Sequence, residues 1–123
     1  MIGYFYDTYA LIEIYKGNNN YDKYKSGVSI KTSKLNIMEF VYFLLREGVN
    51  LPDILKLLDK CNFVLVDFQY IHIAEAMQFR LRNKKLELSY PDCVGYILSS
   101  NLGIKFLTGD SKFQGRENVE FVQ

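Results

Sequence analysis

From Ile2 to Gly17 the chain reads IGYFYDTYALIEIYKG, and two secondary-structure elements can be recognised in it. The first five residues are apolar, with aromatic and β-branched members, which is typical of a short buried strand. Residues Thr8 to Lys16 then carry apolar side chains at helical spacing, and Gly17 is placed to end the helix in the left-handed conformation. The segment therefore predicts a strand followed directly by a helix, with Asp7 at the junction.

Strands and helices alternate through the rest of the chain. Apolar runs predict further strands at Val28–Thr32, which alternates weakly and suits a sheet edge, and at the buried segments Phe63–Val66, Ile104–Leu107 and Val119–Val122. Apolar spacing predicts helices at Leu35–Glu47, at Leu51–Leu58 after an Asn50 cap and Pro52, at Tyr70–Asn83 and at Pro91–Leu102. This order indicates an α/β fold of three layers, α/β/α, with a central and mostly parallel sheet.

Two of these helices carry a clear expectation about burial. The helix over Leu35–Glu47 is apolar nearly all round, so we expect it to be buried. The helix over Tyr70–Asn83 is amphipathic, and its spacing predicts an inward face made of Ile73, Ala74, Met77 and Leu81.

Composition limits the function classes. The 123 residues, 49% of them hydrophobic, suit a single domain over 1–123 and exclude a disordered chain. The net charge of +1 neither indicates nor excludes a nucleic-acid partner. Cys61 and Cys93 are expected to be buried, reduced thiols, and with His72 as the sole histidine a Cys/His zinc site is excluded. The amino-terminal segment resembles neither a signal peptide nor a membrane span, so we expect a cytoplasmic protein without a membrane partner.

Carboxylates recur where a parallel sheet places its ligands, beyond the carboxyl ends of the strands. Asp7 follows the first strand, Asp110 follows the strand Ile104–Leu107, and Asp92 opens the helix before that strand. Glu39 lies among apolar residues of a buried helix. Four neighbouring carboxylates repel one another unless a cation neutralises them, and ligands that are all oxygen suit Mg²⁺ or Mn²⁺. Such ions activate water for attack on a phosphodiester, so no Ser/His/Asp or Cys/His arrangement is needed.

Each acid also has a purely structural interpretation. Glu39 could be the capping-box partner of Asn36, and Asp92 could favour the start of its helix. Asp7 could cap the first helix, and Asp110 could belong to an ordinary turn. The position of all four acids at the same predicted edge favours a common site.

The chain resembles the PIN-domain family over essentially its whole length. The resemblance rests on Ile2–Leu11, on Asn36-Ile37-Met38-Glu39-Phe40, and on two closing segments, Asp92–Leu98 and Leu102–Asp110 with Phe113. It implies a metal-dependent ribonuclease in which Asp7, Glu39, Asp92 and Asp110 are the catalytic, metal-binding acids and Thr8 assists the first of them. It also implies that a stand-alone chain of this length is a VapC-type toxin, a homodimer neutralised by an antitoxin protein.

Two positions depart from the family pattern. Lys112 stands where many members carry a further acid, and Tyr9 stands where many have Ser or Asn. Thr8, Lys112, Arg80 and Arg82 are the candidate contacts to the RNA substrate, although solvated lysine and arginine side chains are the ordinary alternative.

Two other functions fit parts of the sequence. A PIN fold used for RNA processing or binding, with weak or no nuclease activity, is compatible with the lysine at position 112. A receiver domain of two-component signalling fits poorly, because the chain has neither paired acids after the first strand nor a Lys-Pro dipeptide after a late one.

Overall fold

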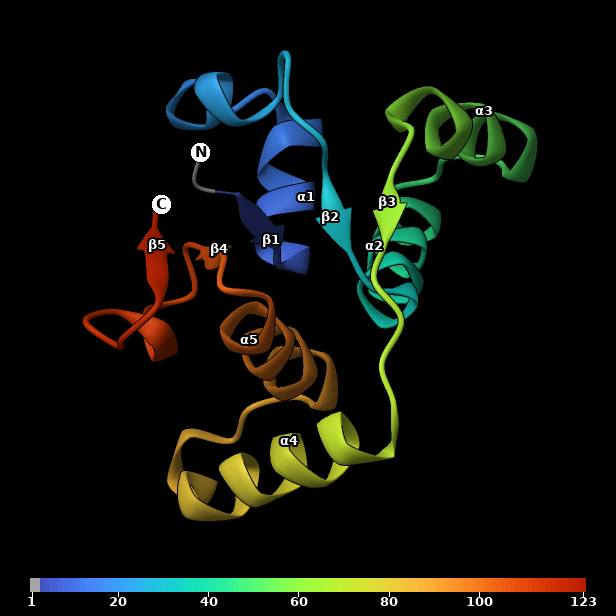
Figure 1. Ribbon diagram of the computed structural model, residues 1–123. Helices are drawn as coiled ribbons and strands as arrows, with labels where there is room; N and C mark the ends of the chain where they lie inside the picture. Colours follow the sequence, from blue (N-terminus) through green and yellow to red (C-terminus); the bar gives the residue numbers. More distant parts are fainter. Residues whose placement is uncertain (1–2) are drawn as a thin grey trace.

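The computed structural model describes residues 3–123, arranged as a central sheet with helices on both sides (Figure 1). The sheet order is β3-β2-β1-β4-β5, and every described strand pair is parallel. The strands are β1 (Tyr4–Tyr6), β2 (Lys31–Thr32), β3 (Val64–Leu65), β4 (Lys105–Thr108) and β5 (Val119–Phe121). The helices are α1 (Thr8–Lys16), α2 (Lys34–Arg46), α3 (Leu51–Cys61), α4 (Tyr70–Arg82) and α5 (Tyr90–Leu102), with short 3-10 turns η1 (Asn19–Tyr24), η2 (Lys84–Leu86) and η3 (Ser111–Phe113).

Local signals in the sequence set the ends of most helices. The side chains of Ser33, Asn50 and Ser89 each accept a hydrogen bond from the backbone of the first turn that follows. Gly17 and Gly103 adopt the left-handed conformation that ends α1 and α5, as their positions predict. The predicted first strand began at Ile2, which lies outside the described residues.

Two apolar clusters flank the sheet and make the three layers. On one face, α1, η1, α2 and α3 cover the sheet, with Tyr6 and Leu107 pointing into this cluster. On the other face, α4 and α5 pack over Phe5 and Phe106. Alternate residues of the same strands therefore belong to opposite clusters, and the predicted three-layer α/β/α fold with a parallel sheet is confirmed.

The predictions about two strands were wrong. β2 lies between β1 and β3, so the segment Val28–Thr32 does not form the sheet edge. The edge is β3, where the side chains of Val64 and Leu65 are each 44% exposed, although an apolar run at Phe63–Val66 predicts burial. The reason is topological: a run of four apolar residues has the same appearance in a central strand and in an edge strand that no helix covers.

The predictions about helix burial were wrong in two places. In α2 only one side is buried, and Met38 and Tyr42 are 66% and 64% exposed. In α4 the predicted inward residue Leu81 is 71% exposed and Ile73 is 40% exposed, whereas Ala76 is fully buried against α5. Both helices are apolar on more sides than the domain covers, so periodicity alone does not select the buried face.

The two cysteines are both free thiols. Cys93 is buried as expected, whereas Cys61, at the end of α3, is only half-buried. Among residues 3–123 no helix has the length and apolar character needed to cross a bilayer.

Candidate functional site

Four acidic side chains from four parts of the fold line one cavity of about 480 Å³. Asp7 immediately follows β1, and Asp110 follows β4, the strand that pairs with β1 in parallel. Glu39 comes from α2, and Asp92 is the third residue of α5. Because the carboxyl ends of β1 and β4 meet at one edge, the sheet brings Asp7 and Asp110 together, and the two helices add the other acids from either side.

Asp7 is the most deeply buried of the four, with 2% of its surface exposed. One carboxylate oxygen accepts a hydrogen bond from the backbone N–H of Thr8 at 2.8 Å, and the other accepts one from the Thr108 hydroxyl at 2.7 Å. Burial, followed by the negative charges of Asp92 and Glu39, raises the pKa of Asp7 to about 8 despite these two hydrogen bonds. Within residues 3–123, no positive charge is among the causes of this shift.

Glu39 is held by a short chain of side chains from α1 and α2. The Thr8 hydroxyl donates to the Glu39 carboxylate at 2.5 Å, and the buried Asn36 amide donates to the Thr8 hydroxyl at 3.1 Å. The cap of α2 is Ser33, which pairs with Asn36, so the interpretation of Glu39 as a capping partner of Asn36 was wrong. Burial raises the pKa of Glu39, and the charge of Asp92 adds to the effect while the Thr8 hydrogen bond opposes it.

The remaining two acids each have a structural contact as well as a place in the cavity. Asp92 forms a reciprocal capping box with Ser89: the backbone N–H of Ser89 donates to the Asp92 carboxylate and the backbone N–H of Asp92 donates to the Ser89 hydroxyl, with nitrogen-to-oxygen distances of 3.0 and 3.1 Å. Asp110 accepts the backbone N–H of Lys112 at 3.0 Å. Burial and the charge of Asp110 raise the pKa of Asp92, while the Ser89 hydrogen bonds and Lys112 lower it. Capping and site formation are therefore compatible roles for the same carboxylates.

The loop that carries Asp110 is held by close packing at Gly109. A Cβ atom there would lie 2.2 Å from the carbonyl oxygen of Val122 and 2.3 Å from the ring of Tyr9. Only glycine permits this approach. Tyr9, one of the departures from the family pattern, therefore packs against the loop that positions the fourth acid and also lines the cavity.

The carboxylates share the cavity without forming a compact ligand cluster. Within residues 3–123, no three His, Cys, Asp or Glu side chains are grouped closely enough to hold a metal ion in these conformations. Mutual repulsion between unneutralised acids is a physical reason for this spacing, since Asp92 raises the pKa of both Asp7 and Glu39.

The candidate substrate contacts fall in two groups. Thr8 lines the cavity, whereas Lys112, Arg80 and Arg82 lie outside its lining. The ammonium group of Lys112 is 3.3 Å from the carbonyl oxygen of Glu87. The Nε of Arg80 donates to the carbonyl oxygen of Leu88 at 2.9 Å, and its guanidinium lies 5.2 Å from the centre of the Tyr90 ring.

Sequence reasoning missed several residues of the cavity. Tyr42 and Arg46 follow Glu39 at intervals of three and seven residues, so helical spacing from a candidate acid was the signal that could have found them. The contribution of Ser89 is local, and the Ser-x-x-Asp spacing to Asp92 was the signal for it, whereas the contact of Asn36 with Thr8 is long-range and only the structure reveals it.

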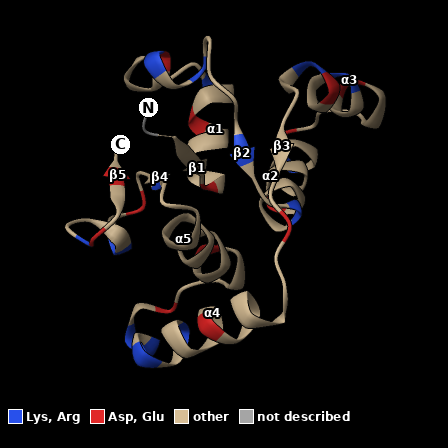
Figure 2. Ribbon diagram, viewed as in Figure 1, with Lys and Arg blue, Asp and Glu red and all other residues tan. Residues whose placement is uncertain are grey.

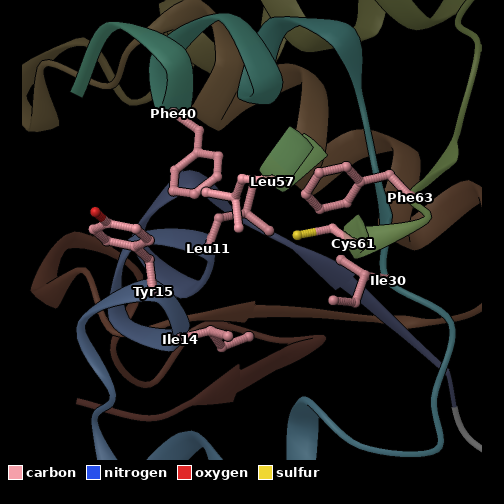
Figure 3. Close-up of a pocket in the computed structure, with 8 residues that line it drawn as sticks. All are labelled: Leu11, Ile14, Tyr15, Ile30, Phe40, Leu57, Cys61 and Phe63. Carbon is pink, nitrogen blue, oxygen red and sulfur yellow. The ribbon is translucent and has the colours of Figure 1, made fainter. Parts of the chain in front are cut away.

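A second cavity, of about 250 Å³, lies between α1, α2 and α3 and is almost entirely apolar (Figure 3). Its lining contains no carboxylate. The one chemically reactive group there is the Cys61 thiol, whose pKa is raised by burial, so the thiol remains protonated and is a poor nucleophile at neutral pH. The acidic cavity is thus the better candidate for chemistry.

Comparisons with known proteins agree with this architecture. The sequence model of the PIN-domain family matches residues 4–117. A search of curated proteins finds no match.

Three solved structures are similar to the chain over most of its length. A toxin–antitoxin complex from Klebsiella pneumoniae gives a TM-score of 0.73 at 14% identity, with 96% of this chain and 95% of that chain covered. A protein from Pyrobaculum aerophilum gives a TM-score of 0.70 at 16% identity, with 98% of this chain and 89% of that chain covered. VapBC2 from Rickettsia felis, bound to a DNA fragment from its promoter, gives 0.67 at 18% identity, covering 100% of both chains. At these identities the likeness shows the fold.

Proposed function

This chain belongs to the PIN-domain family, and from that premise we propose that it is a divalent-cation-dependent endoribonuclease, the toxin of a VapC-type toxin–antitoxin pair. PIN domains are generally nucleases. The observation that carries the proposal is the meeting of Asp7, Glu39, Asp92 and Asp110 around one cavity at the carboxyl edge of the sheet. A cavity lined by four acids, with no histidine or cysteine in its lining, suits metal-assisted phosphodiester hydrolysis better than nucleophilic catalysis by a side chain.

The donor set fits Mg²⁺ or Mn²⁺. The four proposed ligands are carboxylates, and the pKa values of Asp7, Glu39 and Asp92 are raised first by burial and then by the charges of neighbouring carboxylates, which together make an excess of negative charge. A bound divalent cation supplies positive charge that offsets this excess and the charge that develops on the phosphate oxygens during cleavage.

The neighbouring polar residues orient these acids. Thr108 and the Thr8 backbone hold the two oxygens of Asp7, while the Thr8 hydroxyl, itself fixed by Asn36, holds Glu39. Ser89 fixes the rotamer of Asp92 through the capping box. Thr8 also lines the cavity, and we propose that it contacts the substrate. Lys112 is a further candidate contact, and its positive charge lowers the pKa of Asp92.

The proposed partners follow from the same family membership. Two of the similar structures are toxin–antitoxin complexes, which supports an antitoxin as the protein partner. We propose RNA as substrate, with Arg80 and Arg82 as further candidate contacts, and a cytoplasmic homodimer in which residues 1–123 form a single domain. A PIN fold that binds or processes RNA with weak nuclease activity is the second candidate, favoured by Lys112 in place of a fifth acid.

The proposal is tested with purified protein, single-stranded RNA and either Mg²⁺ or Mn²⁺. Cleavage should require the cation and stop on chelation. Asp7→Asn and Asp92→Asn preserve shape but remove charge, so each should lower the cleavage rate by roughly a hundredfold or more. Asp67 is an exposed acid in the loop between β3 and α4, and Asp67→Asn should leave the rate unchanged. Equal rates in all four proteins would indicate a contaminating nuclease and contradict the proposal.

A further inference from the structure

Positive charge is concentrated beside the acidic cavity, at the carboxyl-terminal end of α4 and in the loop around η3. Residues 80–87 and 111–117 contain six Lys and Arg and two Glu, a local net charge of +4 in a chain whose total is +1. Figure 2 shows a cluster of basic residues where α4 ends. No ion pair with a carboxylate involves these six cations within residues 3–123.

Two adjoining hollows run through this region. One, of about 380 Å³, is lined by Arg82, Lys84 and Lys85. The other, of about 480 Å³, is lined by Lys112 and by the loop that follows η3. Leu86 and Arg116 line both hollows, so the two adjoin. Together they are here called the basic groove, whose cations are Arg82, Lys84, Lys85, Lys112 and Arg116.

Lys112 joins the basic groove to the acidic cavity. Its backbone N–H donates to Asp110, and its ammonium charge lowers the pKa of Asp92. Its side chain meanwhile lies on the carbonyl oxygen of Glu87, next to η2. Lys112 thus lies at the groove while its backbone contacts one of the four acids, so the groove begins next to the acidic cavity.

The acidic cavity itself holds little positive charge. Beside the four acids, its described lining has Arg46 as its one cation, together with apolar and aromatic residues such as Ile12, Tyr42 and Phe43. Four carboxylates repel a polyanion, so binding of a nucleic acid requires compensating positive charge near the site. The basic groove offers five cations, whereas the lining of the acidic cavity offers one.

Resting on the proposed nuclease function, we propose that the basic groove holds the phosphodiester backbone of single-stranded RNA next to the scissile bond. Arg82, Lys84 and Lys85 are exposed and make no side-chain hydrogen bond among residues 3–123, so they can reach phosphates. Arg116 is held in place by a 3.1 Å hydrogen bond to Asn83 and by the ring of Phe79. Arg80 is committed to Leu88 and Tyr90, which gives it a supporting role. The apolar residues that line the groove are Leu81, Leu86 and the buried Tyr96, and they stand beside five cations, so the test below includes an acidic protein as the competing occupant.

The test uses a labelled single-stranded RNA and full-length protein in chelator, so that binding is measured without cleavage. The Lys84→Gln/Lys85→Gln double variant should weaken RNA binding roughly tenfold. The negative slope of the log association constant against log salt concentration should become shallower by about 1.4, or about 0.7 for each lost phosphate contact. The matched control is Lys56→Gln/Lys60→Gln, two exposed lysines on α3, which lies far from the end of α4 in Figure 1. With Mg²⁺ present, the groove variant should raise KM and leave kcat near the wild-type value.

The outcomes separate this inference from the proposed function. If wild type cuts RNA but the groove and control variants bind with equal affinity and salt slope, the groove assignment is overturned and the nuclease proposal stands. The groove assignment would also be overturned if the groove variant lost as much affinity for polyglutamate as for RNA, because the groove would then suit an acidic protein. Wild-type protein that neither binds nor cuts RNA would overturn both.

Discussion

At the scale of single residues, Asp7 shows the balance on which the site depends. It accepts two hydrogen bonds, which favour its ionised form, yet burial and two nearby carboxylates outweigh them and raise its pKa to about 8. In the metal-free protein, burial therefore favours the protonated form of this acid. Acids with perturbed pKa values in a cleft are candidates for functional residues.

The raised pKa of Asp7 predicts how the stability of the metal-free protein depends on pH. Between its unfolded value of 3.8 and about 8, the folded state keeps the proton while the unfolded state has lost it. The free energy of unfolding should therefore fall as pH rises through this window, by up to about 1.4 kcal/mol per pH unit, and level off above it. Asp7→Asn should flatten this dependence, as measured by denaturant unfolding in chelator at pH 5 and pH 8.5. A variant with the wild-type slope, or loss of that slope in Asp67→Asn, would contradict the assignment.

At the scale of elements, the position of α5 is set by contact with the sheet. Gly95 lets the helix approach so closely that an added Cβ would lie 2.8 Å from the ring of Phe5 and 2.9 Å from the ring of Phe106. Phe5 belongs to β1 and Phe106 to β4, the two strands whose carboxyl ends precede Asp7 and Asp110. The depth of α5 over the sheet thus also determines where Asp92 lies.

Gly95→Ala tests this contact. Alanine favours the helix by about 1 kcal/mol, but the clash with two fully buried rings should cost more, giving a net loss of roughly 1–2 kcal/mol. Ser100→Ala, at an exposed position of the same helix, gains propensity without a clash and should stabilise slightly. Thermal unfolding of both variants gives the comparison. A Gly95→Ala protein as stable as Ser100→Ala would show that the rings move aside at little cost.

At the scale of the whole molecule, the domain leaves more apolar surface exposed than one small core absorbs. On α4, Tyr70 is 90% exposed, Leu81 71% and Ile71 59%, and the edge strand β3 adds Val64 and Leu65. Exposed apolar area of this extent on a small chain is a feature of proteins that associate.

We expect the purified chain to be a homodimer, because association would cover part of this surface. Light scattering over a range of concentrations should give about twice the chain mass of 14.4 kDa, with dissociation only on strong dilution. Raising the salt concentration should not dissociate it, since apolar contacts are not screened. A single 14.4 kDa species at high concentration would contradict the expectation.

Much of this structure was accessible from local pattern. Apolar runs, helical spacing and the glycines at positions 17 and 103 predicted the order of elements and most of their ends, because strand and helix periodicities are properties of neighbouring residues. The same order predicted a parallel sheet, and the acids after β1 and β4 were placed at one edge because parallel strands share their carboxyl ends.

Tertiary structure alone decided which of several apolar faces is buried and which strand lies at the edge. Leu81 and Ala76 are both apolar residues of α4, yet packing against α5 buries Ala76 and leaves Leu81 in solvent. Long-range packing likewise determined that Asn36 holds Thr8 and that Tyr9 fits against Gly109. Sequence spacing determines what each segment can become, whereas burial and hydrogen-bond partners depend on segments that are distant in the chain, as Asp7 and Thr108 are at a separation of 101 residues.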